Sequence, residues 1–471
     1  MAWIAALTLS LITFLIRFWP RVRLLKYGDD TWFHLLIADV YRKEKALPRK
    51  YPHFIPPSDS DYPPGFSMLL SLLNKQWLDR WERYLAPAME GVTSAAIFGF
   101  AFWLTHSLWV ASFAALLYAL TPAVAFQAAS LNPRLVGYFL HLLTGLCLVW
   151  GGNEFHWAVF GIVILLGALI LYTHKMTAQA WIALVLGYAL LQGVWAYVWG
   201  IPLALILACG LSKGHYLKVL RGHIKLVRMH LRSLLDPAMQ VYSADTRKQA
   251  LIKGGIWAGL LLFFSAAIPD KSPALWALFA WAWSLFAAFA LTSFVRPLRC
   301  LGEGYRYLEY GMAPWVILWG ISLLQPGPFR LILGAAAILY IGLGWIQIRR
   351  NCEVHRNHYP NIVDEDRMTV YQFMNGLAKE GGVLCCPSGM SYATAYFTRF
   401  QVLWMPNSGW EQVPWLFPQI TPNPSLPFSG IVSQYGIRYI LHHQNFCKPA
   451  QLKLTNAEVL IHKGPYRLLK V

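Results

Sequence analysis

Charged residues are scarce in this sequence, and acidic ones are the scarcest. Charged side chains occupy 13% of the 471 positions, whereas 57% of the positions are apolar. That balance excludes an ordinary soluble protein, in which about a quarter of the residues are charged. We therefore expect the chain to be integrated into a membrane.

The shortage of acidic residues leaves a large positive charge. The 40 Lys and Arg outnumber the 22 Asp and Glu, which gives a formal net charge of +18. The basic residues lie in loops beside apolar segments, where lipid headgroups or lipid-linked phosphates are the expected partners. We expect membrane lipids as partners and no nucleic acid.

Several sequence motifs are also missing. The seven Cys include no C-x-x-C pair, so their spacing defines neither a zinc site nor a disulfide framework. The chain has no P-loop, no G-x-G-x-x-G and no H-E-x-x-H. Nucleotide hydrolysis, dehydrogenase and zincin chemistry therefore have no motif to support them.

Apolar stretches recur along the first three quarters of the chain. They occupy 2–16, 85–104, 108–126, 135–150, 157–172, 177–192, 195–211, 251–268, 274–294, 312–324 and 331–346. Because about 20 mainly apolar residues cross the ~30 Å hydrocarbon core, these stretches predict a polytopic transmembrane helical bundle of about 10–12 spans. The fold class is thus mainly α.

We assign residues 1–350 to the membrane module. It includes a long first loop, 17–84, and a basic amphipathic segment, 212–236, which is typical of a helix lying on a membrane. The apolar run 66–73 is too short to span and is expected at the membrane interface.

Residues 351–471 have the composition of a soluble domain. Helix-like runs at 368–377 and 391–398 alternate with strand-like runs at 382–386, 401–405 and 439–442. A hairpin is predicted at 459–469, turned by Gly464 and Pro465. Together these runs predict a C-terminal soluble α/β domain.

Counting the spans places every long polar segment on one side of the membrane. These segments are the first loop, 127–134, 173–176, 212–236, 295–310 and the terminal domain, and the other side receives only tight turns. We therefore expect one face to build the functional site. The positive-inside rule alone would place this basic face in the cytoplasm.

The first loop opens with adjacent carboxylates, Asp29 and Asp30, just beyond the first span. A carboxylate there can accept a proton from an acceptor hydroxyl, or ligate a divalent cation that neutralises a phosphate leaving group. The alternative is a solvated loop start whose acids offset Arg23 and Lys26. We predict Asp29 and Asp30 as catalytic residues. No cofactor is certain, and Mg²⁺ or Mn²⁺ would be held by one of them.

Three other residues of the first loop are candidates. His34 follows Asp30 by four residues, which places both on one face of a helix, so we predict it as a supporting catalytic group. Asp61 and Tyr62 precede two prolines and are predicted to bind substrate. The alternatives are an ordinary interfacial His and an Asp that only caps a turn.

Basic and aromatic residues gather between two late spans, in the run R-Y-L-E-Y. We predict Arg306, Tyr307 and Glu309 as substrate-binding residues, because guanidinium groups hold phosphate bidentately and tyrosines stack on sugar rings. Arg134, and His174 with Lys175, are candidates of the same kind on the same face. Anchoring of helix ends at the membrane boundary is the alternative for all of these charges; it explains Arg134, His174 and Lys175 at least as well, whereas the tyrosines beside Arg306 favour a site role there.

The order of four short motifs resembles the GT-C superfamily of integral membrane glycosyltransferases, which includes protein O-mannosyltransferases, aminoarabinose transferases and oligosaccharyltransferase catalytic subunits. The motifs are G-D-D-T-W-F-H-L after the first span, D-Y-P-P-G-F closing the first loop, N-P-R-L-V-G-Y before the fourth span, and R-Y-L-E-Y before a late one.

The resemblance implies a GT-C-type bundle that transfers a sugar from a polyprenyl-phosphate-linked donor to an unknown acceptor. It also implies a site on the extracytoplasmic face of the plasma (inner) membrane. Asp29 or Asp30 would be the base or metal ligand, and Arg306 would contact carrier phosphate. The loop before Arg134 lacks the acidic pair that oligosaccharyltransferases use to complete a metal site, and no W-W-D-Y-G occurs.

Two other functions fit the same residues. A non-catalytic transporter or flippase of lipid-linked glycans would use these cations only to guide a phosphate headgroup. A subunit of a glycan-assembly complex would use the terminal domain for association.

Overall fold

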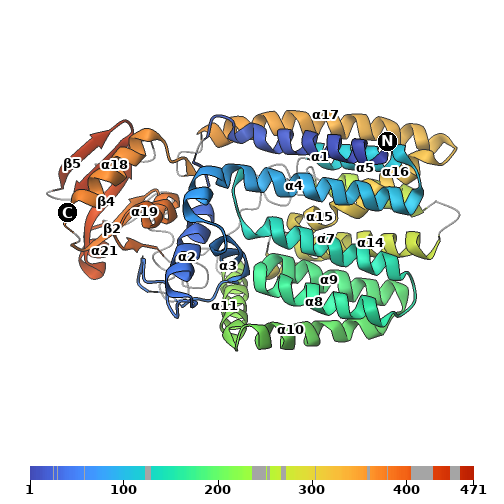
Figure 1. Ribbon diagram of the computed structural model, residues 1–471, viewed down its shortest axis with the longest axis horizontal. Helices are drawn as coiled ribbons and strands as arrows, with labels where there is room; N and C mark the ends of the chain where they lie inside the picture. The colour runs from blue at the N-terminus through green and yellow to red at the C-terminus, as the bar shows by residue number, and fades with distance from the viewer. Residues whose placement is uncertain are drawn as a thin grey trace.

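The computed structural model describes residues 1–471 except Leu25, Asp29, Ser58, Glu303, Lys379 and the ranges 122–128, 236–250, 252–254, 267–271, 358–360, 405–427 and 446–456. Figure 1 shows an elongated molecule with a helical bundle at one end and a sheet-containing domain at the other. The N-terminus lies at the end of the bundle that is far from this domain.

Long helices run side by side in the bundle. They are α1 (Ala2–Phe18), α4 (Lys75–Thr105), α5 (Leu108–Leu120), α7 (Pro133–Gly151), α8 (Trp157–Thr173), α9 (Lys175–Gln192), α10 (Gly200–Leu211), α13 (Ile256–Ala266), α14 (Pro273–Phe294), α16 (Met312–Leu324) and α17 (Pro328–Asn357). Five helices within the described ranges are long and apolar enough to cross a membrane, and four shorter ones are also apolar. The expected mainly helical membrane bundle is confirmed.

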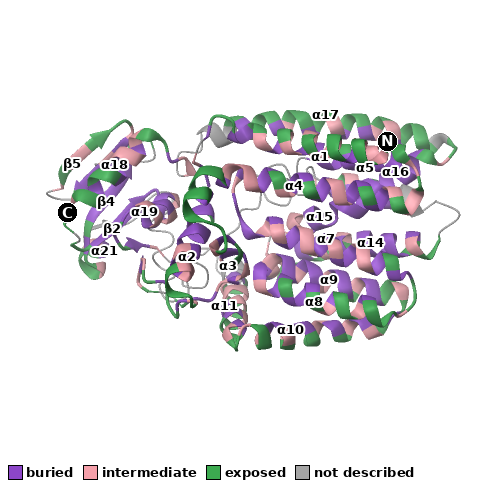
Figure 2. Ribbon diagram, viewed as in Figure 1, coloured by how far each residue is buried: buried purple, intermediate pink, exposed green. Residues whose placement is uncertain are grey.

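The outside of the bundle is apolar. Trp3, Leu7, Leu11 and Leu15 of α1 are all more than half exposed. Figure 2 shows exposed residues along the outer faces of α1, α17 and α10, while buried residues line the inner faces. Such an outer surface suits contact with lipid tails rather than with water.

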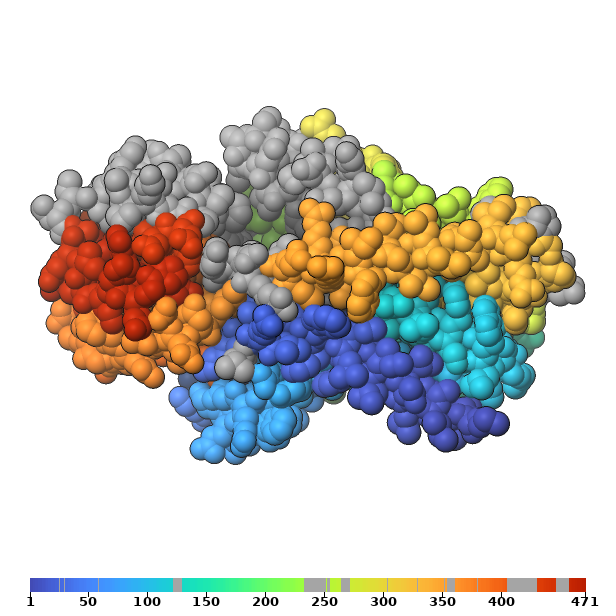
Figure 3. All heavy atoms as spheres, turned by 90° about the horizontal axis from the view of Figure 1, so that it is seen from above, coloured from blue at the N-terminus to red at the C-terminus, as the bar shows by residue number. Residues whose placement is uncertain are grey.

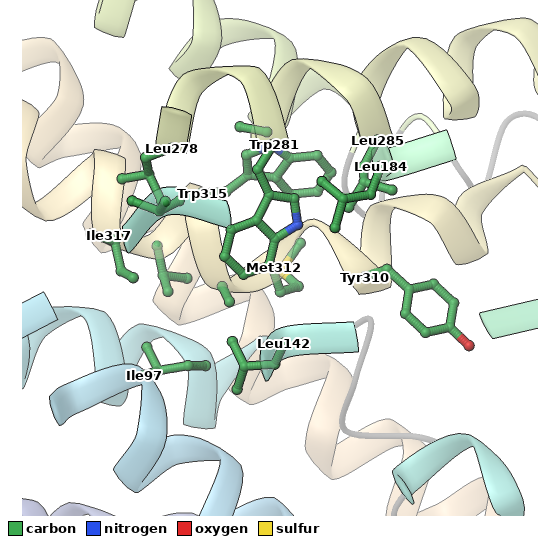
Figure 4. Packing of buried hydrophobic residues seen from close by; sticks show 14 of the residues in the cluster. Ile97, Leu142, Leu184, Leu278, Trp281, Leu285, Tyr310, Met312, Trp315 and Ile317 are labelled. Carbon is green, nitrogen blue, oxygen red and sulfur yellow. The ribbon is translucent and has the colours of Figure 1, made fainter. Parts of the chain in front are cut away.

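The interior of the bundle is filled by large aromatic side chains that enter next to glycines. Trp181 and Trp281 are fully buried. A Cβ on Gly167 of α8 would overlap the Trp181 ring, and one on Gly145 of α7 would overlap the Trp281 ring. Figure 4 shows Trp281 in the middle of the packed cluster and Tyr310 at its edge, with the hydroxyl directed away.

A second set of helices gathers at the end of the bundle that faces the sheet domain. They are η1 (Trp19–Arg21), α2 (Asp30–Glu44), α3 (Gly65–Ser71), α11 (His215–Leu235), η6 (Arg296–Leu301) and α15 (Tyr305–Tyr310), whereas η3 (Trp195–Trp199) precedes α10. In Figure 1, α11 lies across the ends of the horizontal helices α9 and α10. This arrangement agrees with the expectation that the long polar segments share one face.

The terminal domain is built on a six-stranded sheet of order β1-β3-β2-β4-β6-β5. The strands are β1 (Phe54–Ile55), β2 (Gly382–Cys386), β3 (Val402–Leu403), β4 (Ile437–His443), β5 (Glu458–Lys463) and β6 (Tyr466–Lys470). Strands β1 to β4 pair in parallel, and β5 and β6 are antiparallel. The helices α18 (Glu365–Gly376), α19 (Ser391–Phe397) and α21 (Phe428–Tyr435), with η8 (Ser388–Met390), complete the expected α/β domain.

One strand of this sheet comes from the first loop. Phe54 and Ile55 of β1 pair with Val402 and Leu403 of β3. The first loop and the terminal domain also share a hydrophobic core, in which the Trp32 ring lies 4.8 Å from the ring of Phe397. The two segments therefore form one packed layer over the end of the bundle. Figure 3 shows the terminal domain, in red and orange, at this end of the molecule.

Candidate active site

Asp30 is held at the end of the bundle by the start of α2. Gly28 precedes it with a φ of +119°, a conformation that favours glycine, and its amide donates to the Asn361 carbonyl over 2.9 Å. Thr31 Oγ1 donates to the Leu131 carbonyl (3.1 Å) and accepts from the Leu131 amide (3.0 Å). Asp30 is thus placed beside the segment that leads into α7.

Arg134 lies in the first turn of α7. The Asn132 side chain accepts a hydrogen bond from the Arg134 amide at 3.0 Å, and Pro133 occupies the first helical position, which is a strong helix start. Arg134 is close enough to stabilise the charge of Asp30, and so is Arg306 of α15. Two helices far apart in the sequence therefore each place a positive charge near the Asp30 carboxylate.

The surroundings of Asp30 have opposite effects on its pKa. Its side chain is exposed to solvent, yet protein surrounds it on several sides. Withdrawal from bulk water raises the pKa of Asp30, and the positive charges of Arg134 and Arg306 lower it, with the first effect being the larger. Asp29, the other predicted catalytic carboxylate, lies outside the described residues.

His34 points to α3 rather than to Asp30. Its Nδ1 lies 3.0 Å from Ser67 Oγ, and its ring lies 5.4 Å from the ring of Tyr62 and 5.2 Å from that of Phe66. Burial lowers the pKa of His34 to about 3, so the ring is neutral at physiological pH. A neutral His34 holds the closing part of the first loop against α2.

Tyr62 lies between His34 and the charged residues. Burial raises its pKa, and the Asp30 carboxylate raises it further. Lys175 Nζ lies 5.6 Å from the centre of the Tyr62 ring, within the range of a cation–π contact. Tyr62 therefore lies close to both the Asp30 carboxylate and the Lys175 ammonium group.

Lys175 and Asp61 form a second group of charges. Both residues are less than a tenth exposed. Burial raises the pKa of Asp61 to about 6, and the charge on Lys175 opposes that rise. Among the described residues, neither Lys175 Nζ nor Asp61 Oδ1 has a hydrogen-bond partner. Such groups are suited to a polar ligand, because an unsatisfied buried donor or acceptor is unfavourable.

His174 and Tyr310 form a buried hydrogen-bonded group with Thr177. His174 Nδ1 lies 2.9 Å from Thr177 Oγ1, which lies 2.7 Å from the Tyr310 hydroxyl. Burial lowers the pKa of His174 well below its usual value, and Arg134 and Arg306 lower it further. His174 is therefore neutral and adds no charge to the two guanidinium groups.

The remaining predicted residues lie on α15. The Tyr307 hydroxyl donates to Gln179 Oε1 over 3.4 Å, and Gln179 Nε2 lies 2.8 Å from His223 Nε2 on α11. Glu309 is buried close to Tyr310: burial raises the pKa of Tyr310, and the charge of Glu309 adds to that rise.

The structure brings the described candidates into one region between α2, α3, α7, α9 and α15. Asp30, Tyr62, Arg134, His174 and Arg306 influence one another electrostatically, and Lys175 with Asp61 lies beside them. The sequence analysis missed the supporting residues, which are Ser67, Thr177, Gln179, His223 and Tyr310. Tyr310 had a signal, since it closes the R-Y-L-E-Y motif.

The donor set for a divalent cation is poor in the described part of the chain. No group of three or more His, Cys, Asp and Glu side chains there could hold a metal ion. Among the described residues, the charges that act on Asp30 are those of Arg134 and Arg306, whereas hard cations prefer several oxygen ligands. The described residues fit an anionic phosphate better than they fit Mg²⁺ or Mn²⁺.

No family model and no curated protein sequence matches this chain. Solved structures do match it. The oligosaccharyltransferase of Archaeoglobus fulgidus in its apo form has a TM-score of 0.63 at 11% identity, over 94% of this chain and 69% of that one. AglB of the same organism, in complex with an inhibitory peptide and a dolichol-phosphate, has a TM-score of 0.62 at 10% identity, over the same shares.

A second kind of solved structure covers nearly the whole of both chains. ArnT from Cupriavidus metallidurans bound to undecaprenyl phosphate has a TM-score of 0.58 at 11% identity, over 99% of this chain and 97% of that one. At such identities the likeness shows the fold alone. The chain has the fold of GT-C glycosyltransferases, and the resemblance drawn from the four motifs is confirmed at that level.

Proposed function

We propose that the chain is a glycosyltransferase that moves a sugar from a polyprenyl-phosphate-linked donor to an acceptor still to be identified. The observation that carries the proposal is the carboxylate of Asp30 facing Arg134 and Arg306 at the end of the bundle. The proposal is also supported by the fold, because structures similar to this chain were solved with dolichol-phosphate and with undecaprenyl phosphate.

Arg134 and Arg306 are proposed to hold the donor phosphate. Guanidinium groups bind phosphate through paired, charge-assisted hydrogen bonds, and these two come from different helices, so they can approach it from two sides. The carrier chain would lie among the lipid tails beside the bundle. The phosphate would then stay at the membrane surface, next to Asp30.

An inverting displacement accounts for the chemistry with these groups. The acceptor oxygen attacks C1 of the sugar, and Asp29 or Asp30 accepts its proton. The bond from C1 to the phosphate oxygen breaks, its electron pair stays on the phosphate, and the two guanidinium groups stabilise the added charge.

The second group of charges is proposed to bind the sugar. Asp61 and Lys175 can accept from and donate to its hydroxyls, and Tyr62 can pack against the ring. Tyr307 would line the site, and Glu309 would act through Tyr310. His34 is proposed as a positioning residue, since it holds Ser67 and Tyr62 instead of Asp30.

The catalytic test compares Asp30→Asn with Asp59→Asn, an exposed carboxylate of the same loop. With membranes that contain a polyprenyl-phosphate-linked sugar, D30N should lose about 10²–10⁴-fold in turnover and still bind donor, while D59N stays near the native rate. If Asp29 is the base, D29N loses turnover instead. A chain that moves the lipid-linked sugar across the bilayer, with D30N and D29N both unaffected, is a transporter and not a transferase.

The location proposed for the site is the extracytoplasmic face of the plasma (inner) membrane. Single cysteines at Ala46 and Lys463, both exposed, would test it in an otherwise Cys-free variant. A membrane-impermeant maleimide should label both in intact cells. Labelling only after the membrane is opened would place the site in the cytoplasm, as the positive-inside rule alone suggests.

A further inference from the structure

Helix α11 exposes two adjoining stripes of different chemistry. The apolar stripe consists of Leu217, Ile224 and Leu231, which are exposed and recur every seven residues. The basic stripe consists of Lys218, Arg221, Arg228 and Arg232, which are also exposed. Because seven residues make almost two helical turns, the apolar residues line up along the helix, and the basic residues, spaced three, seven and four apart, form a second line beside them.

The other side of α11 is occupied by packing. Tyr216, Val219 and His230 are buried. Gly222 packs closely against Asp61, because a Cβ added to Gly222 would lie only 2.5 Å from Asp61 Oδ2. The helix also packs on η6. This side of α11 therefore packs against the rest of the protein, whereas the apolar and basic stripes remain partly accessible.

The charge of the basic stripe is not balanced on its own helix. No Asp or Glu occurs anywhere in α11. Within the described residues, none of the four stripe cations forms an ion pair. A surface with four cations and no carboxylate attracts anions, and an adjoining apolar stripe allows those anions to carry acyl chains.

We propose that the exposed face of α11 binds anionic phospholipid, with the basic stripe on the headgroups and the apolar stripe among the first carbons of the acyl chains. Helix α11 lies across the ends of α9 and α10 (Figure 1), and the end of a helix that crosses a membrane is where the headgroups are expected. This inference goes beyond the proposed transfer reaction and does not depend on it.

The inner side of α11 links such a lipid to the site. His223 lies 2.8 Å from Gln179, which accepts from Tyr307, and Gly222 lies against Asp61. A lipid bound to the outer face would hold α11 in position and, through these contacts, would also hold Tyr307 and Asp61 in position. Lipid composition would then act on the site without entering it.

The test uses the full-length chain reconstituted in nanodiscs of phosphatidylcholine and phosphatidylglycerol at a ratio of four to one, and then extracted in mild detergent. Mass spectrometry counts the phosphatidylglycerol that stays bound. We expect the native chain to enrich it, and K218Q/R221Q/R228Q/R232Q to reduce that enrichment roughly ten-fold or more, because each cation near an anionic surface contributes about 1 kcal/mol.

The matched control removes the same number of charges from the first loop. Lys43, Lys45, Arg49 and Lys50 are exposed and have no apolar stripe beside them. K43Q/K45Q/R49Q/K50Q should stay within two-fold of the native enrichment. If the α11 variant keeps its phosphatidylglycerol, or if the control loses as much, the proposal is wrong.

Further variants distinguish a lipid on α11 from a lipid in the candidate active site and from misfolding. Arg306→Gln should leave the enrichment unchanged, and a loss there would place the lipid in the candidate active site and overturn the proposal. The half variants K218Q/R221Q and R228Q/R232Q guard against misfolding of the full variant. Each should show the native unfolding temperature and at least a three-fold loss of enrichment.

Discussion

Replacing Arg21 with Met is expected to destabilise the protein more than altering its carboxylate partner. Arg21 Nη2 lies 2.6 Å from Glu82 Oε1, and the two side chains are 1% and 3% exposed. Arg21 also donates to the carbonyl oxygens of Ala129 (2.7 Å) and Leu24 (3.2 Å). The R21M variant therefore leaves a buried carboxylate without its cation and two carbonyls without a donor.

The size of the effect follows from the protonation of Glu82. Breaking a buried ion pair from one side costs about 3–5 kcal/mol. The cost of the unpaired charge cannot exceed the free energy of protonating Glu82, because a protonated Glu82 is neutral and needs no cation. For a glutamate with the ordinary pKa of about 4.3, that free energy is about 3.7 kcal/mol at pH 7 and about 1 kcal/mol at pH 5. We expect R21M to lose about 4 kcal/mol of stability at pH 7 and clearly less at pH 5.

The sign of the pH dependence is fixed by the folded state. In R21M the folded chain favours the protonated form of Glu82 more than the unfolded chain does, so the destabilisation grows as the pH rises. Glu82→Gln also breaks the pair, but it keeps Arg21 on its two carbonyls and offers the Gln oxygen as an acceptor, so it should cost less than R21M at pH 7. In R21M/E82L both charges are gone, and part of the loss should be recovered.

Thermal unfolding in detergent micelles, followed by intrinsic tryptophan fluorescence, measures this series. At pH 7 the unfolding temperature should fall furthest in R21M and less in both E82Q and R21M/E82L. The reasoning is refuted if R21M is no less stable than E82Q at pH 7, or if its deficit is the same at pH 5.

Three other predictions follow from the site and the bundle. Because burial raises the pKa of Asp61 to about 6, Asp61→Asn should stabilise the chain above pH 6 by up to about 3 kcal/mol and have no effect below about pH 4, which unfolding temperatures across pH would show. Gly167→Ala, which pushes a methyl into the Trp181 ring, should cost about 1–3 kcal/mol, whereas Gly161→Ala on the same helix, with open space around it, should be neutral or stabilising. EDTA should change turnover by less than two-fold, because in the proposed reaction Arg134 and Arg306 neutralise the phosphate; a loss restored by Mg²⁺ or Mn²⁺ would contradict this.

The membrane helices could be predicted because each is an apolar run that ends at polar residues. The predicted stretch 157–172 corresponds to α8 (Trp157–Thr173), and the predicted strand 382–386 coincides with β2. The hydropathy pattern could not predict where a helix ends when that end lies in polar sequence. Helix α4 begins at Lys75, ten residues before its apolar stretch, because Asn74 caps it by accepting from the amides of Gln76 and Trp77.

The candidate site was predictable as a set of residues but not as a set of contacts. Topology placed Asp30, Arg134, His174 and Arg306 on one face, and the structure brings them together. The partner of His34 is Ser67, a contact between residues 33 positions apart that no local spacing reveals. The catalytic and binding roles of these residues stay predictions.

The sequence also could not predict that the first loop contributes strand β1 to the sheet of the terminal domain. A two-residue strand inside a long polar loop has no periodicity of its own, and its partner in β3 is also only two residues long. Parallel pairing between such distant segments depends on the tertiary fold rather than on local propensity.

The pairing of β1 with β3 has a consequence for biosynthesis. Phe54 leaves the ribosome roughly 350 residues before Val402, an interval of roughly 20–70 s at about 5–20 residues per second. Until then the strand from the first loop has no sheet to join, although the early helices already lie in lipid. The nascent chain therefore resides in the membrane well before the first loop and the terminal domain can pack together. A ribosome that stalls in this interval leaves membrane helices whose first loop lacks the sheet that it normally joins.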